Sequence, residues 1–482
     1  MNETAVRDDN EYRRQRLANL AELRSLGIEP LRGAWPRTGT LAEVRAAFSD
    51  GARAVIAGRL TTIRDMGKSI FADLRDGSDR FQIYVQKQAL GDEAFAAFKL
   101  LDTGDHIGAE GSLFTTRTGE QTLKAEKWTL LSKAVRPLPE KWHGLKDVEA
   151  RYRRRYLDLV ANPAVRELFN KRIRAVQVIR QYLADRGFQE VETPMMQPLA
   201  GGAAARPFNT RYEALGADMF LRIAPELYLK RLLVGGFDKV FELNRNFRNE
   251  GLSRTHNPEF TMLEIYEAYS DVNGMRDLIT GLITHVASEV FGTLSVGSEE
   301  QPIDLTPPWR EAAYADLVRE KMGDDWPGIP VDEARRRAEA LGLAVEPDWD
   351  LLLIGHEVYE KLVEKTLMQP TFVRRLPAAL IPLARACEDD PDCADVFELV
   401  IGGQEIAPAY TELNDPLEQR ERLLAQVGGD AGGLDEDFLT ALEHGMPPAG
   451  GMGVGIDRLM MILTGAEAIR DVILFPQLRP RG

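Results

Sequence analysis

The amino-acid sequence predicts an α+β protein in which a small five-stranded β-barrel precedes a larger mixed domain. The chain has 482 residues, about three times the length of a typical domain, so two or more folded units are expected. Between residues 52 and 135, short β-prone runs are separated by glycine and aspartate turns. After residue 163, strand and helix patterns alternate to the C-terminus, as in one large α+β domain.

An N-terminal helical extension, residues 1–50, is expected before the barrel. Leucines recur at helical spacing from Leu17 to Leu26, which predicts an amphipathic helix within residues 11–30 that Gly27 ends.

The order of elements between residues 51 and 135 predicts the type of barrel. A helical run, residues 88–101, follows the third of five β-prone runs. This is the order of an OB-type barrel, which commonly binds single-stranded nucleic acid, although SH3-like barrels also have five short strands. The five runs are residues 54–63, 69–76, 80–87, 106–116 and 126–134. A proline- and arginine-rich linker, residues 136–160, then leads to a large domain, residues 161–482.

Composition excludes several classes of protein. Hydrophobic residues make up 44% and charged residues 28% of the chain, as in a protein with a large buried core. The charged start has no apolar segment of a secretory signal, and no run approaches a membrane span. Cys387 and Cys393 have the spacing of neither a zinc knuckle nor a redox pair. We therefore expect free thiols, a cytoplasmic location and no membrane partner.

The charge distribution limits the expected nucleic-acid partners. A formal charge of −15 argues against a protein that coats nucleic acid, DNA included. Residues 52–135 carry 12 Lys/Arg and 11 Asp/Glu, so the barrel is slightly basic whereas the rest of the chain is acidic. This asymmetry in charge is compatible with a module that binds one RNA through local basic patches.

Two β-prone runs, residues 239–248 and 259–269, predict an antiparallel hairpin with a long polar loop. Because side chains alternate along a strand, Met262, Glu264 and Tyr266 share one face, and Leu263 and Ile265 share the other. This predicts a ligand-facing surface on a packed sheet, with a solvent-exposed sheet face as the alternative.

Further polar residues lie on a second pair of β-prone runs and at two predicted helix starts. Glu398 and Glu405 lie on β-prone runs, and Tyr410 and Glu412 share one strand face. Glu226 stands at a helix start after a proline, where favourable interaction with the helix dipole alone could explain it. Arg458 follows a glycine-rich stretch in the first turn of the last long helix, where a cation opposes the dipole.

Over nearly its whole length, the chain resembles a class II aminoacyl-tRNA synthetase of the lysine, aspartate and asparagine subgroup, specifically a lysyl-tRNA synthetase. GFQEVETPMM resembles motif 1, FRNEGLSRTHNPEFTMLEIYEAY resembles motif 2 and GVGIDRLMMIL resembles motif 3. GGAAARPF and IAPELYLKRL resemble stretches of the lysine enzymes, whereas the aspartate and asparagine enzymes usually have Gln where Glu226 stands.

The resemblance implies a catalytic domain with an antiparallel sheet flanked by helices, which binds ATP in a bent form. Arg248 is implied to hold the α-phosphate and the lysine carboxylate. Arg458 is implied to hold the γ-phosphate and, with Phe260, to sandwich the adenine. These arginines are the implied catalytic residues. The implied ATP-binding residues are Arg248, Glu250, His256, Asn257, Phe260, Glu398 and Arg458. Glu398 and Glu405 match the carboxylates that bind Mg²⁺, a hard cation suited to oxygen ligands.

Three carboxylates, those of Glu226, Glu264 and Glu412, are expected to face one pocket. Buried carboxylates are costly unless cations satisfy them, so this pocket favours a cationic amino acid. The resemblance implies that Glu226 and the backbone near Gly202 take the α-ammonium of lysine, and that Glu412 and Tyr266 take the ε-ammonium. An aspartate pocket would instead need an arginine or a lysine. The implied lysine-binding residues are Gly202, Glu226, Arg248, Glu264, Tyr266, Tyr410 and Glu412.

The implied partners are tRNA(Lys), lysine, ATP and a second copy of the chain, with motif 1 at the dimer interface. Arg64, Phe71 and Gln82 match barrel positions that contact the anticodon, where Phe71 would stack a base and Gln82 would read a base edge. Core packing is the alternative for Phe71.

One departure concerns the run Ala407-Pro408-Ala409, where the family usually has Gly-Asn-Gly. Pro408 has no side-chain donor and no backbone N–H, so lysine binding can differ from that of the family. The expected activity remains lysine–tRNA ligation. The alternatives are a paralogue that transfers lysyl-adenylate to a protein, an inactive RNA-binding relative, and an enzyme specific for aspartate or asparagine.

Overall fold

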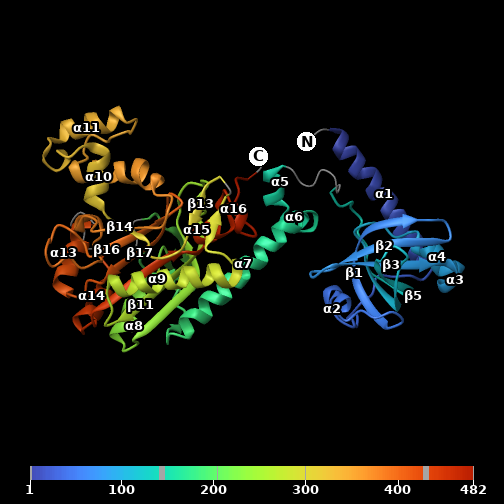
Figure 1. Cartoon of the computed structure of the whole chain (residues 1–482). Helices are drawn as coiled ribbons and strands as arrows, with labels where there is room; N and C mark the ends of the chain where they lie inside the picture. Colours follow the sequence, from blue (N-terminus) through green and yellow to red (C-terminus); the bar gives the residue numbers. More distant parts are fainter. Residues whose placement is uncertain (1–2, 140–146, 203–204, 299, 427–433, 481–482) are drawn as a thin grey trace. The chain divides into compact units, whose positions relative to one another are not determined.

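The protein consists of two compact units, Met1–Lys146 and Asp147–Gly482, each of which is described by itself (Figure 1). The computed structural model describes residues 3–139, 147–202, 205–298, 300–426 and 434–480. Residues 140–146 of the expected linker and residues 203–204 of the GGAAARPF stretch lie outside that range. From residue 148 onward, the expected linker forms α5 (Val148–Arg153) and α6 (Arg155–Ala161) of the second unit.

The first unit contains a closed five-stranded barrel with strand order β1-β2-β3-β5-β4. Only β3 and β5 pair in parallel, and alternate apolar side chains fill the interior, among them Ile56, Leu74 and Ile83. The predicted OB-type barrel is therefore confirmed. Its strands are β1 (Arg53–Asp65), β2 (Ser69–Arg75), β3 (Arg80–Gln86), β4 (His106–Thr115) and β5 (Gln121–Ser132).

Helices accompany the barrel at the predicted places, with two differences. The helix expected at residues 88–101 is split at Gly91, whose φ of 84° favours glycine. Fewer leucines of the N-terminal helix are buried than expected, since Leu23 is buried but Leu17 and Leu26 are exposed. Arg16 anchors it by donating to the backbone carbonyls of residues 103, 134 and 136. The helices are α1 (Glu3–Ser25), α2 (Leu41–Ala46), α3 (Lys87–Leu90) and α4 (Asp92–Phe98).

The second unit is built on an eight-stranded sheet with strand order β14-β15-β16-β17-β18-β11-β10-β6. Neighbouring strands are antiparallel except for the two outermost pairs, β14–β15 and β10–β6. The strands are β6 (Gln189–Glu190), β10 (Lys239–Phe247), β11 (Glu259–Ala268), β14 (Arg310–Ala313), β15 (Thr371–Arg374), β16 (Val396–Ile401), β17 (Gln404–Thr411) and β18 (Ala449–Gly455).

Two small sheets and a set of helices surround the large sheet. The small sheets comprise β7 (Met196–Gln197), β9 (Ala217–Leu221) and β8 (Phe208–Tyr212), and the pair β12 (Ser295–Gly297) and β13 (Pro302–Asp304). The α-helices are α7 (Pro163–Ala184), α8 (Glu226–Val234), α9 (Val272–Val286), α10 (Tyr314–Met322), α11 (Val331–Ala340), α12 (Leu351–Val358), α13 (Pro416–Gln426), α14 (Glu436–Glu443), α15 (Ile456–Thr464) and α16 (Ile469–Val472). Among the described residues, no helix is long and apolar enough to cross a membrane.

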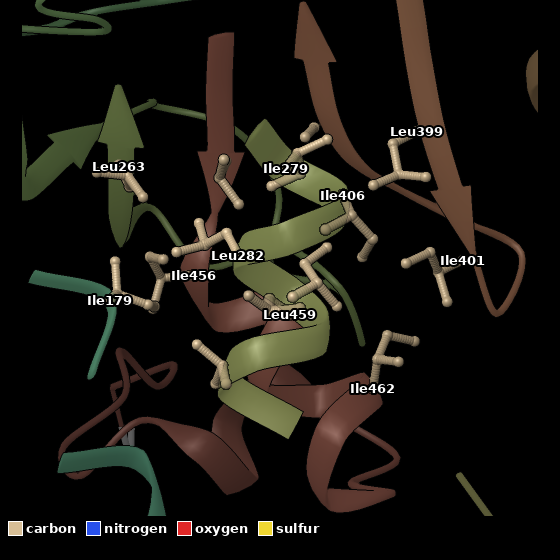
Figure 2. Close-up of a cluster of buried hydrophobic side chains, with 14 of the residues drawn as sticks. Ile179, Leu263, Ile279, Leu282, Leu399, Ile401, Ile406, Ile456, Leu459 and Ile462 are labelled. Carbon is tan, nitrogen blue, oxygen red and sulfur yellow. The ribbon is translucent and has the colours of Figure 1, made fainter. Parts of the chain in front are cut away.

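The main core of the second unit covers one face of the large sheet. Side chains from α7, α9 and α15 meet those of β11, β16 and β17, as Figure 2 shows for Ile179, Ile279 and Leu459. Leu263 and Ile265 of β11 point into this core. The alternation of β11 therefore turns Met262, Glu264 and Tyr266 toward the opposite face, where the cavities lie.

Candidate active site

The long loop between β10 and β11, together with β17 and the start of α15, encloses a polar cavity. Of the residues implied to bind ATP, all except Glu398 line this cavity. The sheet places them together because β11 lies beside β10 on one side and beside β18, which runs into α15, on the other. Three segments distant in sequence therefore meet at one site. The predicted residues that line it are Arg248, Glu250, His256, Asn257, Phe260, Glu405 and Arg458.

Two arginines line this cavity beside three carboxylates, those of Glu250, Glu405 and Asp457. The Arg248 guanidinium lies 5.2 Å from the centre of the Phe260 ring, and its Nε is buried without a hydrogen-bond partner among the described residues. Arg458 Nη1 donates to the backbone carbonyl of Glu405 at 3.0 Å. Because both guanidinium groups lie at the cavity wall, the cavity suits an anion.

His256 is neutral and accepts a hydrogen bond from Arg458. Arg458 Nη2 lies 3.1 Å from His256 Nε2, and a guanidinium can only donate. Nε2 is therefore the acceptor, so Nδ1 carries the proton and donates to Ser253 Oγ at 2.8 Å. Burial, and then the charge of Arg458, lower the pKa of His256, which keeps the ring neutral at physiological pH.

Glu398 and Glu405, the expected magnesium ligands, lie near a third carboxylate, Glu364. Glu364 Oε1 accepts from the backbone N–H of Glu405 at 2.9 Å, and Glu398 Oε2 accepts from the Tyr359 hydroxyl at 3.0 Å. Burial raises the pKa of Glu364 to about 7. Burial and the charge of Glu405 also raise the pKa of Glu398. Within the described ranges, no three metal-ligating side chains are arranged to hold a metal by themselves. Clustered carboxylates with raised pKa values nevertheless fit a divalent cation that phosphate oxygens help to bind.

A second cavity, of about 600 Å³, adjoins the first. Four residues line both cavities: Arg248, Met262, Glu405 and Pro408. The residues implied to bind lysine line this second cavity, with the exception of Glu412. They are Gly202, Glu226, Arg248, Glu264, Tyr266 and Tyr410.

The floor of the second cavity is acidic and buried. Glu264 is only 3% exposed and accepts a hydrogen bond from the Tyr266 hydroxyl at 3.2 Å. Burial, reinforced by the charge of Glu226, raises the pKa of Glu264 to about 8. The alternative of a solvent-exposed sheet face is therefore wrong. The charged form of such a buried acid is unfavourable until a cation lies beside it, so this floor favours a cationic ligand.

Glycines let the walls of this cavity approach each other closely. Gly202 has a φ of 85°, and a Cβ there would lie 3.2 Å from the Cβ of Ala224. A Cβ at Gly451 would lie 1.8 Å from Glu412 Oε1 and 2.5 Å from the Tyr266 ring. The Glu412 carboxylate therefore occupies space that only a glycine leaves open.

A lysine side chain that sequence reasoning missed lies between two of the acids. Lys230 is fully buried, with its Nζ 2.8 Å from Glu226 Oε1 and 2.5 Å from Glu412 Oε2. Burial opposes its charged form, but the two carboxylates outweigh that effect and raise the pKa of Lys230. Lys230 follows Glu226 by one helical turn, so the sequence could have indicated that contact. The contact with Glu412 depends on the tertiary fold.

In the barrel, the three residues expected at the anticodon lie on one face of adjacent strands. Arg64 of β1 pairs in register with Phe71 of β2, and Phe71 pairs with Tyr84 of β3. The Phe71 and Tyr84 rings are 4.7 Å apart between centroids, and Phe71 is half-buried rather than part of the barrel core. Gln82 is buried on the next row, where its Oε1 accepts from the Thr122 hydroxyl at 2.9 Å.

The sequence matches two known families over these same units. The family described as tRNA synthetases class II (D, K and N) matches residues 147–479, and the OB-fold nucleic acid binding domain matches residues 54–131. A lysine–tRNA ligase of Carboxydothermus hydrogenoformans is 51% identical, covering 98% of this chain and 99% of the relative. The chain belongs to the lysine–tRNA ligase family. Lysine–tRNA ligases of Moorella thermoacetica and Bacillus subtilis are 49% and 46% identical, the former over 98% of this chain and 99% of the relative, the latter over 100% and 99%.

Within this lysine–tRNA ligase family, the run at Pro408 is the departure that the sequence indicated. Pro408 lies in β17 opposite Glu398 of β16, and pairing of β17 with β18 begins at the next residue, Ala409. A proline cannot donate to a sheet ladder, and here it stands where both cavities share a wall. Pro408 therefore places an apolar ring at the shared wall, where the resemblance implied a side-chain amide.

Proposed function

We propose that this chain activates lysine with ATP to form lysyl-adenylate, and then transfers the lysyl group to the terminal ribose of tRNA(Lys). The observation that carries the proposal is the shared wall of the two cavities. One cavity offers arginines to phosphates, the other offers carboxylates to ammonium groups, and Arg248 lines both. A reaction between a carboxylate and a phosphate needs both substrates at such a junction.

In the first step, an oxygen of the lysine carboxylate attacks the α-phosphorus and the bond to pyrophosphate breaks. Negative charge develops on the phosphoryl oxygens, so fixed cations stabilise the transition state without a covalent nucleophile. Arg248 is assigned to the α-phosphate and the lysine carboxylate. Arg458 is assigned to the γ-phosphate and, with Phe260, to the adenine. Glu250, His256 and Asn257 complete the nucleotide site.

Mg²⁺ is proposed at Glu398 and Glu405. A bound magnesium ion would neutralise phosphate charge and lower the raised pKa of Glu398. Glu364 would then hold Glu405 in place through the backbone hydrogen bond rather than through the ion.

Selection of lysine is proposed to rest on Glu226 and the backbone near Gly202 for the α-ammonium, and on Glu412 and Tyr266 for the ε-ammonium. Glu264 and Tyr410 complete the pocket. Aspartate or asparagine would offer an α-ammonium to Glu226 but would leave Glu412 without a cation from the substrate. Lys230, a buried cation beside these acids, already contacts Glu226, Glu412 and the carbonyl of Leu383. It is therefore not available to a substrate carboxylate.

In the second step, a terminal ribose hydroxyl attacks the carbonyl carbon of lysyl-adenylate and AMP leaves. Anticodon contacts are proposed at Arg64, Phe71 and Gln82. A nucleic-acid barrel in the same chain favours tRNA over a protein acceptor, and the two arginines at the nucleotide cavity disfavour an inactive RNA-binding relative.

A homodimer through the 163–196 segment and a cytoplasmic location belong to the same proposal. Ile173 of α7 and Met196 of β7 are exposed apolar side chains in that segment, as expected of a surface that a second copy covers. Cys387 and Cys393 are free, as in a reducing compartment. A monomer in sedimentation experiments at micromolar concentration would overturn the dimer.

ATP–pyrophosphate exchange tests the proposed activity. Purified protein with magnesium is assayed with lysine, aspartate, asparagine or buffer alone. Exchange with lysine alone, followed by charging of tRNA(Lys), is the expected result. Exchange with aspartate or asparagine, or lysyl-adenylate formation without tRNA charging, would contradict the proposal.

A further inference from the structure

Lys230 is a fully buried cation that lies between two carboxylates. Three oxygens surround its Nζ: Glu226 Oε1 at 2.8 Å, Glu412 Oε2 at 2.5 Å and the backbone carbonyl of Leu383 at 3.4 Å. These oxygens come from α8, from the residue after β17 and from the segment beside the second cavity. Lys230 is fully buried and lines neither cavity, so its ammonium group is not exposed to a ligand.

The same contacts leave one oxygen of Glu412 without a partner. Glu412 Oε1 is buried and accepts no hydrogen bond from the described residues. It lies over Gly451 and beside the Tyr266 ring, as the close approach of an added Cβ to both groups indicates. A buried carboxylate oxygen without a donor costs free energy, and an ammonium group of a ligand would remove that cost.

No other basic side chain in the described part of the chain forms an ion pair with Glu226 or Glu412. Two buried carboxylates without Lys230 would repel each other, and one of them would bind a proton instead of a ligand. With Lys230, the three groups together carry a single negative charge. This charge suits one ammonium group of an incoming amino acid.

We propose that Lys230 is a positioning residue, which holds Glu226 and Glu412 in place so that each presents its second oxygen to an ammonium group of the amino-acid substrate. The inference rests on the proposed function and deepens it. Lys230 itself does not touch the substrate. Its effect on lysine binding passes through the two acids, and ATP binding in the neighbouring cavity does not depend on it.

The test compares lysine and ATP dependence in ATP–pyrophosphate exchange for K230M, E412Q and K230M/E412Q. Lys239→Met is the matched control, because Lys239 forms an ion pair with Glu267 at 2.6 Å outside both cavities. We expect K230M to raise the KM for lysine about tenfold or more and to leave the KM for ATP within about twofold, which marks loss of an interaction with one substrate. The control is expected to leave both values unchanged.

The double variant separates positioning from folding. E412Q removes the buried charge that K230M leaves unpaired, so the melting temperature of K230M/E412Q should recover relative to K230M. Its KM for lysine should stay high, no higher than about the larger single effect, because residues that act as one unit are not additive. If K230M does not fold, K230Q takes its place in the cycle.

Four outcomes would overturn the inference. Equal changes in the KM for lysine and for ATP, or recovery of lysine binding together with stability in the double variant, would show a merely structural ion pair. Unchanged lysine dependence in K230M beside active wild-type protein would overturn this inference alone. Wild-type protein without lysine-dependent exchange would overturn the proposed function as well.

Discussion

Arg172 Nη2 lies 2.7 Å from Asp457 Oδ1, which joins the long helix α7 to the first turn of α15. Asp457 is nearly buried and also accepts the backbone N–H of Thr261 on β11 at 2.7 Å. One carboxylate therefore links α7 and β11 at the residue that precedes Arg458. This ion pair therefore connects α7, which lies in the proposed dimer surface, to α15, which carries the proposed phosphate ligand Arg458.

We expect Arg172→Met to weaken ATP binding without contacting ATP. Breaking a largely buried pair leaves Asp457 unpaired, at a cost of about 3 kcal/mol in the free energy of unfolding. It also loosens the α15 start that positions Arg458. The KM for ATP should rise more than the KM for lysine in pyrophosphate exchange. Lys171→Met, which removes a more exposed pair with Glu167 one turn away, is the control. Equal behaviour of the two variants would refute this connection.

Pro408→Asn should strengthen lysine binding. The substitution restores a side-chain amide at the wall that the two cavities share and replaces a residue with no N–H to donate. A gained hydrogen bond to a charged group contributes about 1.5 kcal/mol or more, so the KM for lysine should fall by about tenfold, with little change for ATP. Isothermal titration with lysine is the direct measurement. Unchanged affinity would mean that the loss of the family's amide is already offset elsewhere in this site.

The stability of the ligand-free protein should depend on pH through Glu264. The pKa of Glu264 is about 8 in the folded protein, against an ordinary value of 4.5 for glutamate. Between these values the folded state keeps a proton that the unfolded state has lost. The contribution of Glu264 to the free energy of unfolding is therefore complete below pH 4.5, and it falls as pH rises until it is lost above pH 8.

Urea unfolding of wild-type protein and Glu264→Gln at several pH values from 5 to 9 measures this dependence. The wild-type minus variant difference should fall by about 1 kcal/mol per pH unit below pH 8, because one proton is linked. Glu364 and Glu412 are present in both proteins, so their titration cancels in the difference. Parallel stability profiles would show that Glu264 ionises like an ordinary glutamate.

Phe71→Ala should reduce tRNA charging while leaving lysine activation intact. Loss of one stacking contact to a base costs about 1–3 kcal/mol, so the KM for tRNA(Lys) should rise about tenfold or more. Pyrophosphate exchange, which needs no tRNA, should not change. Phe71→Trp keeps a ring and is expected to charge tRNA normally. Loss of exchange in Phe71→Ala would instead indicate that the ring supports the fold.

Local patterns predicted the elements of the site and their faces. Residues 239–248 and 259–269 form the hairpin β10–β11, and its alternation separates Leu263 in the core from Glu264 at the cavity. The barrel follows its predicted strand order, because each strand repeats apolar residues at the period of two that a closed sheet requires. The structure differs from these expectations at two places in the first unit. Gly91 splits a helix that was expected to be continuous, and Arg16 rather than a row of leucines anchors the N-terminal helix.

The sequence by itself determined the fold class, the family and the segments that carry the charged residues of both cavities, because periodicity and motifs are local properties of the chain. Only the tertiary structure decided which charges meet. Lys230 lies on α8 and Glu412 lies 182 positions later, yet their charged groups are 2.5 Å apart. Arg172 and Asp457 are likewise joined only by packing of α7 on α15. Coulomb interactions act through space rather than along the chain, so the balance of buried charge exists only once the sheet brings these segments together.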